Sequence, residues 1–273
     1  MKKITARELR EYQEREDERS YLIIDVRQMA EYEKGHIPGS LILPLDEFEE
    51  QVDQLPEKHL VFYCRSGVRS YAAALTADFF NEAGKEIYNL EGGFLAWDGF
   101  DIKGIPLVER INIDMEMDAV LTSAMNLEKG AFLFYDHVME RYPETGLDHV
   151  VRQVRDGELG HAKLIYSHLK KIAPDCPSFE EIYTPLKGDI LEGGHKLNEM
   201  LASLDRGSDN RKLNILETAV TMEYMAFDLY RVISEKVQDD NNEDNPLQEA
   251  FYSLSQAEKA HMKILLQCLE ESL

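Results

Sequence analysis

A cysteine lies beside two cationic residues in the stretch Cys-Arg-Ser-Gly-Val-Arg-Ser, which begins at Cys64. An apolar run at 60–63 precedes it and an Ala-rich run at 72–75 follows, so Cys64 is predicted to lie at a strand-to-helix turn. The N–H groups of a tight turn and a helix N-terminus favour an anion, and Arg65 and Arg69 add positive charge. We therefore expect a nucleophilic thiolate, open to solvent, with a pKa below that of an ordinary free thiol. A buried structural cysteine is the alternative interpretation.

A second group of chemically active residues repeats in the C-terminal half of the chain. The pattern Glu-x-x-Ala-Phe-x-x-Tyr begins at Glu128 and at Glu223, and the pattern Glu-x-x-His begins at Glu158 and at Glu258. A Glu and a His three residues apart lie on one face of a helix, so both can point into the same site. Burying four carboxylates without a cation is costly, whereas a pair of iron or manganese ions needs such ligands. We therefore predict a two-metal site with the ligands Glu128, Glu158, His161, Glu223, Glu258 and His261.

The elements that position Cys64 alternate between strand-like and helix-like patterns. Short apolar runs separated by helical stretches predict buried strands at 21–26, 41–43, 60–63 and 87–90. Alternation of this kind predicts an open, mostly parallel α/β sheet covered by helices on both faces. In such sheets the ligand binds beyond the C-terminal ends of the strands, which is where Cys64 falls.

The rest of the chain has helical patterns only. Four long amphipathic stretches lie at 117–141, 148–172, 210–238 and 246–269. The long segment between the second and third contains a shorter helix near 192–204 and fits the crossover of one known bundle topology. A Gly and a Pro near residue 105, with a loss of periodicity, mark the boundary between domains. We therefore predict a multi-domain chain, with an α/β domain at 1–108, a linker at 109–115 and an all-α four-helix bundle at 116–273.

Short motifs of the N-terminal domain carry a family resemblance. In chain order they are Asp25-Val26-Arg27, Glu31, Gly35 to Ser40, Cys64 to Ser70, Leu90 to Phe94 and Trp97. Together they resemble a single-domain rhodanese. The resemblance implies a sulfurtransferase, in which a sulfane sulfur from thiosulfate or polysulfide forms a persulfide on Cys64 and then passes to a thiol acceptor. It also implies that the two arginines hold the anionic donor and that backbone amides of the loop cradle the outer sulfur. The implied substrate-binding residues are therefore Arg65, Ser66, Gly67, Val68, Arg69 and Ser70.

The length of the cysteine loop bears on its substrate. Four residues separate Cys64 from Arg69, whereas the related phosphatases and arsenate reductases have five, which make a larger cradle for a tetrahedral oxyanion. The shorter loop favours sulfur over phosphate. Asp25 and Arg27 we interpret as a buried ion pair that braces this loop.

The repeated motifs of the C-terminal half resemble those of a rubrerythrin or another ferritin-like di-iron protein. The resemblance implies a ferritin-like bundle that holds two irons with the six ligands named above and reduces hydrogen peroxide or dioxygen. The chain departs from the family in two places. It has only three cysteines, so it contains no four-cysteine rubredoxin to feed electrons, and it has Ala226 where a further glutamate is common. The electron donor is therefore unknown.

Composition limits the partners and the location. The sequence contains 30 Lys and Arg against 52 Asp and Glu, a formal net charge of −22 at pH 7. Because this charge repels phosphate backbones, we expect no nucleic-acid partner. No apolar run approaches the roughly 20 residues of a membrane span, and the N-terminus lacks a signal-peptide pattern, so we expect no membrane contact and a cytoplasmic location. Cys64, Cys176 and Cys268 are too widely spaced to predict a disulfide framework.

These observations lead to one principal hypothesis and two alternatives. The principal hypothesis is a two-domain enzyme, a sulfurtransferase joined to a di-iron oxidoreductase. The first alternative is an iron-binding or redox-sensing protein whose rhodanese domain has a docking or sulfur-sensing role. In the second, the bundle is mainly a dimerisation platform, and its glutamates and histidines form salt bridges without metal. A homodimer is the default expectation for the assembly.

Overall fold

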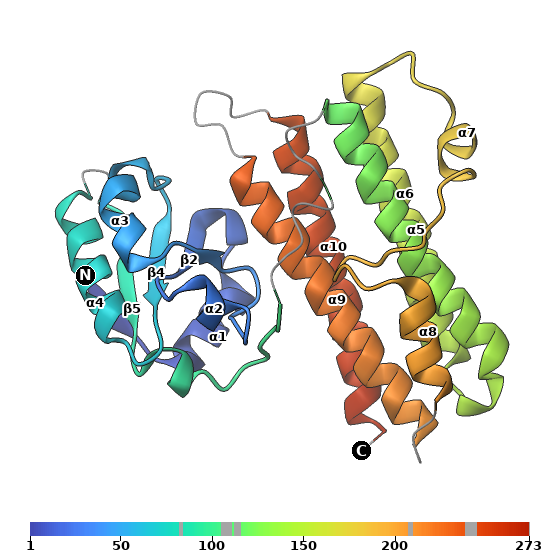
Figure 1. The fold of residues 1–273 in the computed structure, drawn as a ribbon, viewed down its shortest axis with the longest axis horizontal. Coiled ribbons are helices and arrows are strands. Elements are labelled where there is room, and N and C mark those ends of the chain that lie inside the picture. The colour runs from blue at the N-terminus through green and yellow to red at the C-terminus, as the bar shows by residue number, and fades with distance from the viewer. Residues whose placement is uncertain (82–83, 105–110, 112–115, 207–209, 238–244, 273) are drawn as a thin grey trace. The chain divides into compact units, whose positions relative to one another are not determined.

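The computed structural model describes residues 1–273 except 82–83, 105–110, 112–115, 207–209, 238–244 and 273. The chain divides into two compact units, Met1–Ile105 and Pro106–Leu273 (Figure 1). The predicted linker at 109–115 lies outside the described residues, apart from Ile111. Each unit is described below by itself.

The N-terminal unit is built on a five-stranded parallel sheet, as predicted. Its spatial order is β1-β5-β4-β2-β3, and every pair of neighbours is parallel. The strands are β1 (Lys2–Ile4), β2 (Tyr21–Asp25), β3 (Leu41–Ile42), β4 (His59–Tyr63) and β5 (Ile87–Leu90). The sequence did not reveal β1, because it has only three residues and two of them are exposed lysines. It pairs with β5 at the edge of the sheet.

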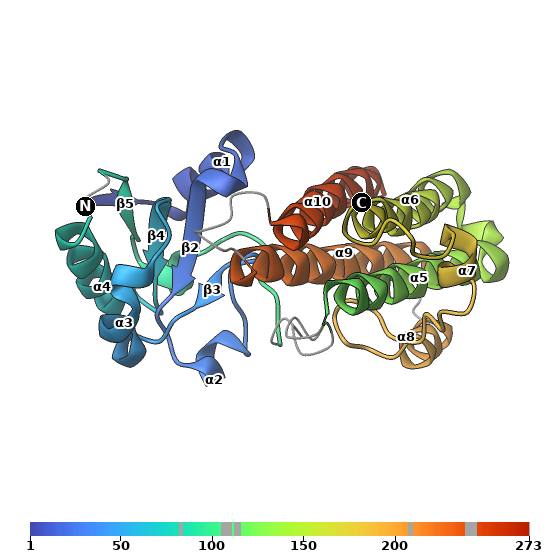
Figure 2. The same ribbon diagram turned by 90° about the horizontal axis from the view of Figure 1, so that it is seen from above.

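Helices cover both faces of this sheet. In the described part of this unit the α-helices are α1 (Ala6–Arg15), α2 (Met29–Tyr32), α3 (Leu45–Gln51) and α4 (Val68–Phe79). Helix α1 lies on one face of the sheet and α3 and α4 lie on the other (Figure 2). Leu9 of α1 belongs to one core cluster with Ile23 and Val61, whereas Ala74 of α4 belongs to another with Phe62. Alternate residues of the central strands therefore belong to different cores, which explains why β2 and β4 have almost continuous apolar sequences.

The C-terminal unit contains four long helices, which match the predicted bundle. They are α5 (Met117–Arg141), α6 (Asp148–Ile172), α9 (Arg211–Lys236) and α10 (Pro246–Glu270). Two short helices, α7 (Phe179–Tyr183) and α8 (Leu197–Asp205), lie in the crossover between α6 and α9. The predicted start of the crossover helix at residue 192 is wrong, because Gly194 adopts a left-handed φ of 74° and a turn at 191–195 delays the helix.

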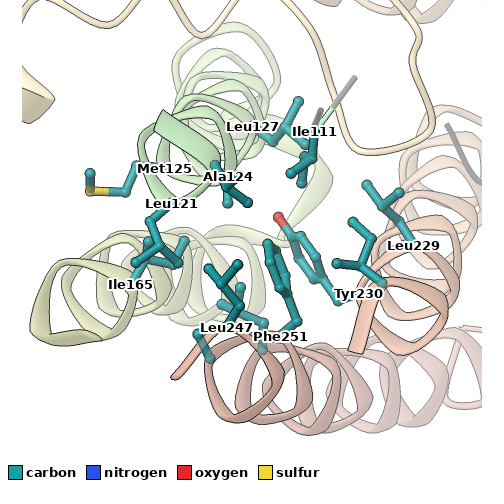
Figure 3. Close-up of a cluster of buried hydrophobic side chains, with 14 of the residues drawn as sticks. Ile111, Leu121, Ala124, Met125, Leu127, Ile165, Leu229, Tyr230, Leu247 and Phe251 are labelled. Atoms are coloured by element: carbon teal, nitrogen blue, oxygen red, sulfur yellow. The ribbon is translucent and has the colours of Figure 1, made fainter. Parts of the chain in front are cut away.

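The hydrophobic core of the bundle is divided into two layers. One layer surrounds Tyr230 and Phe251 (Figure 3), and the other surrounds Tyr135 and Leu216. On each long helix, residues of one layer precede a short polar segment and residues of the other layer follow it. These four polar segments contain all six predicted metal ligands. None of the described helices combines the length and the apolar character that a membrane span requires.

Candidate functional site

Cys64 lies in the loop between β4 and α4, as predicted. Gly67 ends this loop as the residue before α4, with a left-handed φ of 89° that suits glycine. The expectation of a thiol open to solvent is wrong, because Cys64 is only 1% exposed. Its side chain belongs to the same buried cluster as Ala73 and Ala74 of α4.

Hydrogen-bond donors nevertheless surround the sulfur. The Gly67 N–H donates to Cys64 Sγ at 3.2 Å, and the Ser70 hydroxyl lies 3.5 Å from Sγ and 2.6 Å from Asn89 Oδ1. Burial raises the pKa of Cys64, but the Ser70 hydroxyl and the backbone N–H groups of Ser66, Gly67 and Ser70 outweigh it and lower the pKa overall. The surroundings of the Cys64 sulfur therefore favour the thiolate, although the side chain is buried.

The two arginines of the loop have different surroundings. Arg69 donates two hydrogen bonds of 2.9 Å to the carboxylate of Glu31. Arg65 is exposed, and its guanidinium has no partner among the described residues. Only Arg65 therefore offers an unpaired positive charge to an incoming anion.

The segment after β5 holds the cysteine loop from the other side. The N–H of Phe94 donates to the Cys64 carbonyl at 2.7 Å, and the N–H of Leu95 donates to the Arg65 carbonyl at 3.0 Å. A Cβ on Gly93 would lie 2.3 Å from the Cys64 carbonyl oxygen, so this approach requires glycine. The Gly-Gly pair in the sequence is the signal for this contact.

Asp25 and Arg27 form the buried ion pair that the sequence indicated. Arg27 Nε lies 2.9 Å from both oxygens of Asp25, and Arg27 Nη2 also donates to the Gly35 carbonyl at 2.8 Å. The guanidinium lies 4.3 Å from the ring centroid of Phe94. The pair thus braces both the 35–40 loop and the segment that holds Cys64.

All six predicted metal ligands meet between the two apolar layers of the bundle. The least buried of them, His161, is 6% exposed. His161 Nδ1 lies 3.1 Å from Glu128 Oε2 and 2.9 Å from Glu258 Oε1. His261 Nδ1 lies 3.1 Å from Glu158 Oε1 and 3.2 Å from Glu223 Oε2. The two imidazole rings stack with centroids 4.5 Å apart, so the two halves of the repeat build one site.

The chemistry of this donor set fits a pair of cations. Oε1 of Glu158 and both carboxylate oxygens of Glu258 are buried and accept no hydrogen bond from the described part of the chain. Ligand atoms of both Glu-x-x-His motifs lie within 4.8 Å of one another. Four carboxylates leave the site anionic even when both imidazoles are protonated, whereas two divalent cations would balance the four carboxylates with both imidazoles neutral.

Protons can balance part of the negative charge of these carboxylates. Burial and the neighbouring carboxylate of Glu258 raise the pKa of Glu128 to about 8. Burial lowers the pKa of His161, but the carboxylates of Glu258 and Glu128 outweigh it and raise that pKa well above its usual value. These protons must leave when a cation binds.

Two tyrosines connect the halves of the repeat. Tyr135 of α5 donates a hydrogen bond to Glu223 of α9, and Tyr230 of α9 donates one to Glu128 of α5. The sequence left open whether these tyrosines only pack. The structure shows that each one also orients a predicted ligand on the opposite helix.

Sequence reasoning missed a further carboxylate at this site. Glu192, in the crossover, is 3% exposed and lines a narrow cavity together with Glu158, Glu223 and Glu258. Burial and the charges of nearby glutamates raise the pKa of Glu192 well above its usual value. No signal in the sequence could identify it, because it lies outside the repeat and reaches the site only through tertiary packing.

Comparison with known proteins finds a family match in each half of the chain. A family model described as a rhodanese-like domain matches residues 5–99, and one described as rubrerythrin matches residues 214–272. A sulfurtransferase of Allochromatium vinosum is 36% identical over 93 residues, which cover 34% of this chain and 82% of the relative. A putative sulfurtransferase of Bacillus subtilis is 38% identical over 84 residues, 30% of this chain and 78% of the relative. A solved rhodanese-like domain protein from Staphylococcus aureus is 29% identical, with a TM-score of 0.32 over 38% of this chain and all of that one.

Proposed function

The chain belongs to the rhodanese-like family through its N-terminal domain and carries a rubrerythrin domain, and on this premise we propose that it is a sulfurtransferase fused to a di-iron oxidoreductase. The proposal of a sulfurtransferase is supported by the position of Cys64 directly after β4 and by its lowered pKa. The metal half rests on the convergence of six buried glutamates and histidines from four helices.

The proposed sulfur transfer uses thiosulfate or a polysulfide as donor. The Cys64 thiolate attacks the sulfane sulfur of thiosulfate, the sulfur–sulfur bond of the donor breaks, and sulfite leaves with the electron pair. The resulting persulfide on Cys64 then gives its outer sulfur to a thiol or to cyanide, and the thiolate is restored. No oxidant or external reductant is needed for this cycle.

The loop supplies binding and electrostatic stabilisation for this step. We propose that exposed Arg65 attracts the anionic donor and that Arg69 helps to hold it while paired with Glu31. The backbone N–H groups of Ser66 and Gly67 lie where they can stabilise charge on the sulfur. Because Cys64 is 1% exposed, we propose that the donor reaches it only when the loop at 65–67 moves.

Thiocyanate formation from thiosulfate and cyanide tests this proposal. We expect activity in the wild-type chain and in Cys176→Ser, and none in Cys64→Ser. Cys176 is half-buried in the bundle unit and serves as the matched control. Equal activity in Cys64→Ser would refute the assignment of the nucleophile.

For the bundle we propose a pair of iron ions, or manganese ions, held by the six glutamates and histidines. Such a pair would supply two-electron reduction of hydrogen peroxide to water, with electrons from a sulfur-derived or protein donor. The protein's own part is to orient the ligands through Tyr135 and Tyr230 and to keep water away with the apolar layers on either side. Metal analysis is expected to find about two ions per chain.

The burial of Cys64 favours a second candidate function. If the loop stays closed to sulfur donors, the N-terminal domain would dock or sense a sulfur partner, and the protein would act through iron binding or redox sensing. The two functions are separated by one pair of measurements. Thiocyanate turnover and peroxide turnover support the enzyme, whereas bound metal without either turnover supports the second candidate.

A further inference from the structure

The crossover approaches the metal site at two points on opposite helices. A Cβ on Gly130 of α5 would lie 2.5 Å from the carbonyl oxygen of Ile190, so the crossover backbone lies directly on α5. A Cβ on Gly193 would lie 2.3 Å from Sδ of Met225 on α9. Gly130 and Met225 occupy equivalent positions of the internal repeat, each two residues after a predicted ligand. The backbone at 190–193 therefore bridges α5 and α9 beside the ligands.

Glu192 lies within this bridge and reaches the ligands. It is 3% exposed and lines a cavity with the carboxylates of Glu158, Glu223 and Glu258. Ala131 and Ala226, another equivalent pair of the repeat, line the same cavity. Their methyl groups are small enough to leave space for a glutamate side chain from the crossover.

The presence of Glu192 beside four other glutamates has no explanation from the protein alone. It is a fifth buried carboxyl group, and the described lining of the cavity contains no Lys or Arg. A side chain with only a packing role at this place would be apolar, because burying a carboxyl group is costly whether it is charged or protonated. Carboxylate oxygens are, in contrast, ordinary ligands of iron and manganese.

We propose that Glu192 is a ligand of the metal pair, contributed by the crossover rather than by a bundle helix. The inference rests on the proposed two-metal site. A consequence is that metal binding fixes the crossover onto the bundle, since one of its residues then holds the metal.

The test compares wild-type protein with Glu192→Gln and with Asp189→Asn. Asp189 is exposed in the same segment, so its variant removes an equal charge without touching the cavity. Calorimetric titration of the metal-free proteins with Co²⁺, together with metal analysis after loading with Fe²⁺, measures affinity and stoichiometry. For Glu192→Gln we expect at least about tenfold weaker binding, or loss of one ion, while Asp189→Asn matches wild type.

Two further measurements separate a ligand from a packing residue. Metal-free Glu192→Gln is expected to unfold at a temperature no lower than wild type, because the substitution removes a buried carboxylate and keeps its shape. Trypsin can cut at the exposed Lys187 and Lys196, which flank Glu192. Metal should slow this cleavage in wild type and in Asp189→Asn, and should have little effect in Glu192→Gln.

The outcomes distinguish this inference from the proposed function beneath it. If wild type binds two ions and Glu192→Gln binds them with equal affinity and equal protection from trypsin, the role of Glu192 is refuted and the metal site stands. If wild type binds no metal at all, the proposed metal function fails and the inference fails with it. A metal-free Glu192→Gln that is less stable than wild type but binds metal normally would also overturn the inference, in favour of packing.

Discussion

Arg69 and Glu31 form a two-pronged ion pair in which both Nη atoms lie 2.9 Å from a carboxylate oxygen. Both side chains are about one-third exposed, so the pair stays close to solvent. It links Arg69, in the first turn of α4, to Glu31 of α2, and the carboxylate compensates the charge of the guanidinium. The two loop arginines therefore have unequal parts in anion binding, which the sequence alone could not reveal.

Substitution of Arg65 tests this inequality. Arg65→Gln removes the unpaired charge of the loop, and we expect the KM for thiosulfate to rise about five- to tenfold with little change in kcat, as for a loss of an exposed charge interaction. Added salt should weaken thiosulfate binding in wild type more than in the variant. Arg7→Gln, at an exposed position of α1, is the control. An unchanged KM in Arg65→Gln would show that the donor does not meet this charge.

The hydrogen bonds to Cys64 predict the pH dependence of its reactivity. Because its pKa is lowered, the thiolate fraction at a given pH exceeds that of an ordinary thiol, and alkylation by iodoacetamide should level off with a midpoint below about 8.5. Ser70→Ala removes a donor, so the midpoint should move to higher pH. Mass spectrometry of the Cys64 peptide follows this site apart from Cys176 and Cys268. A midpoint at or above that of a free thiol would contradict the lowered pKa of Cys64.

The close contact of Gly93 predicts a specific requirement for glycine. Gly93→Ala should abolish thiocyanate formation and lower the unfolding midpoint of the N-terminal domain, because its Cβ would lie 2.3 Å from the Cys64 carbonyl oxygen. Gly84→Ala is the matched control, since Gly84 also has a positive φ, 67°, but no described atom within 4 Å of its Cβ position. The control should cost only about 1–2 kcal/mol for the left-handed backbone. Fluorescence of Trp97, the single tryptophan, monitors this domain. Equal losses in both variants would mean that the contact is unimportant.

The comparison of sequence and structure separates local from tertiary information. The predicted helices at 117–141 and 148–172 match α5 and α6, because the apolar periodicity of long helices is a local signal. The six predicted metal ligands could be selected because their pattern occurs twice in the internal repeat. Burial of Cys64 and the approach of Glu192 depend on contacts between distant segments, and neither has a local signature.

Metal removal should destabilise the bundle, because five buried carboxylates then share one site. At a free metal concentration of about 1,000 times Kd, binding contributes about 4 kcal/mol to the free energy of unfolding. Urea unfolding followed by far-ultraviolet circular dichroism should therefore show a lower midpoint in EDTA than with Fe²⁺ under anaerobic conditions.

Glu128→Gln provides the control for this effect. Glu128 is fully buried, and burial raises its pKa to about 8, so at pH 7 the neutral amide resembles the protonated side chain of the protein without metal but is a poor ligand. We expect the variant to be at least as stable as wild type in EDTA and to gain little from Fe²⁺. A wild-type midpoint that is the same with and without metal would show that these glutamates are compensated by protons and imidazoles alone, as in a bundle that serves only for assembly.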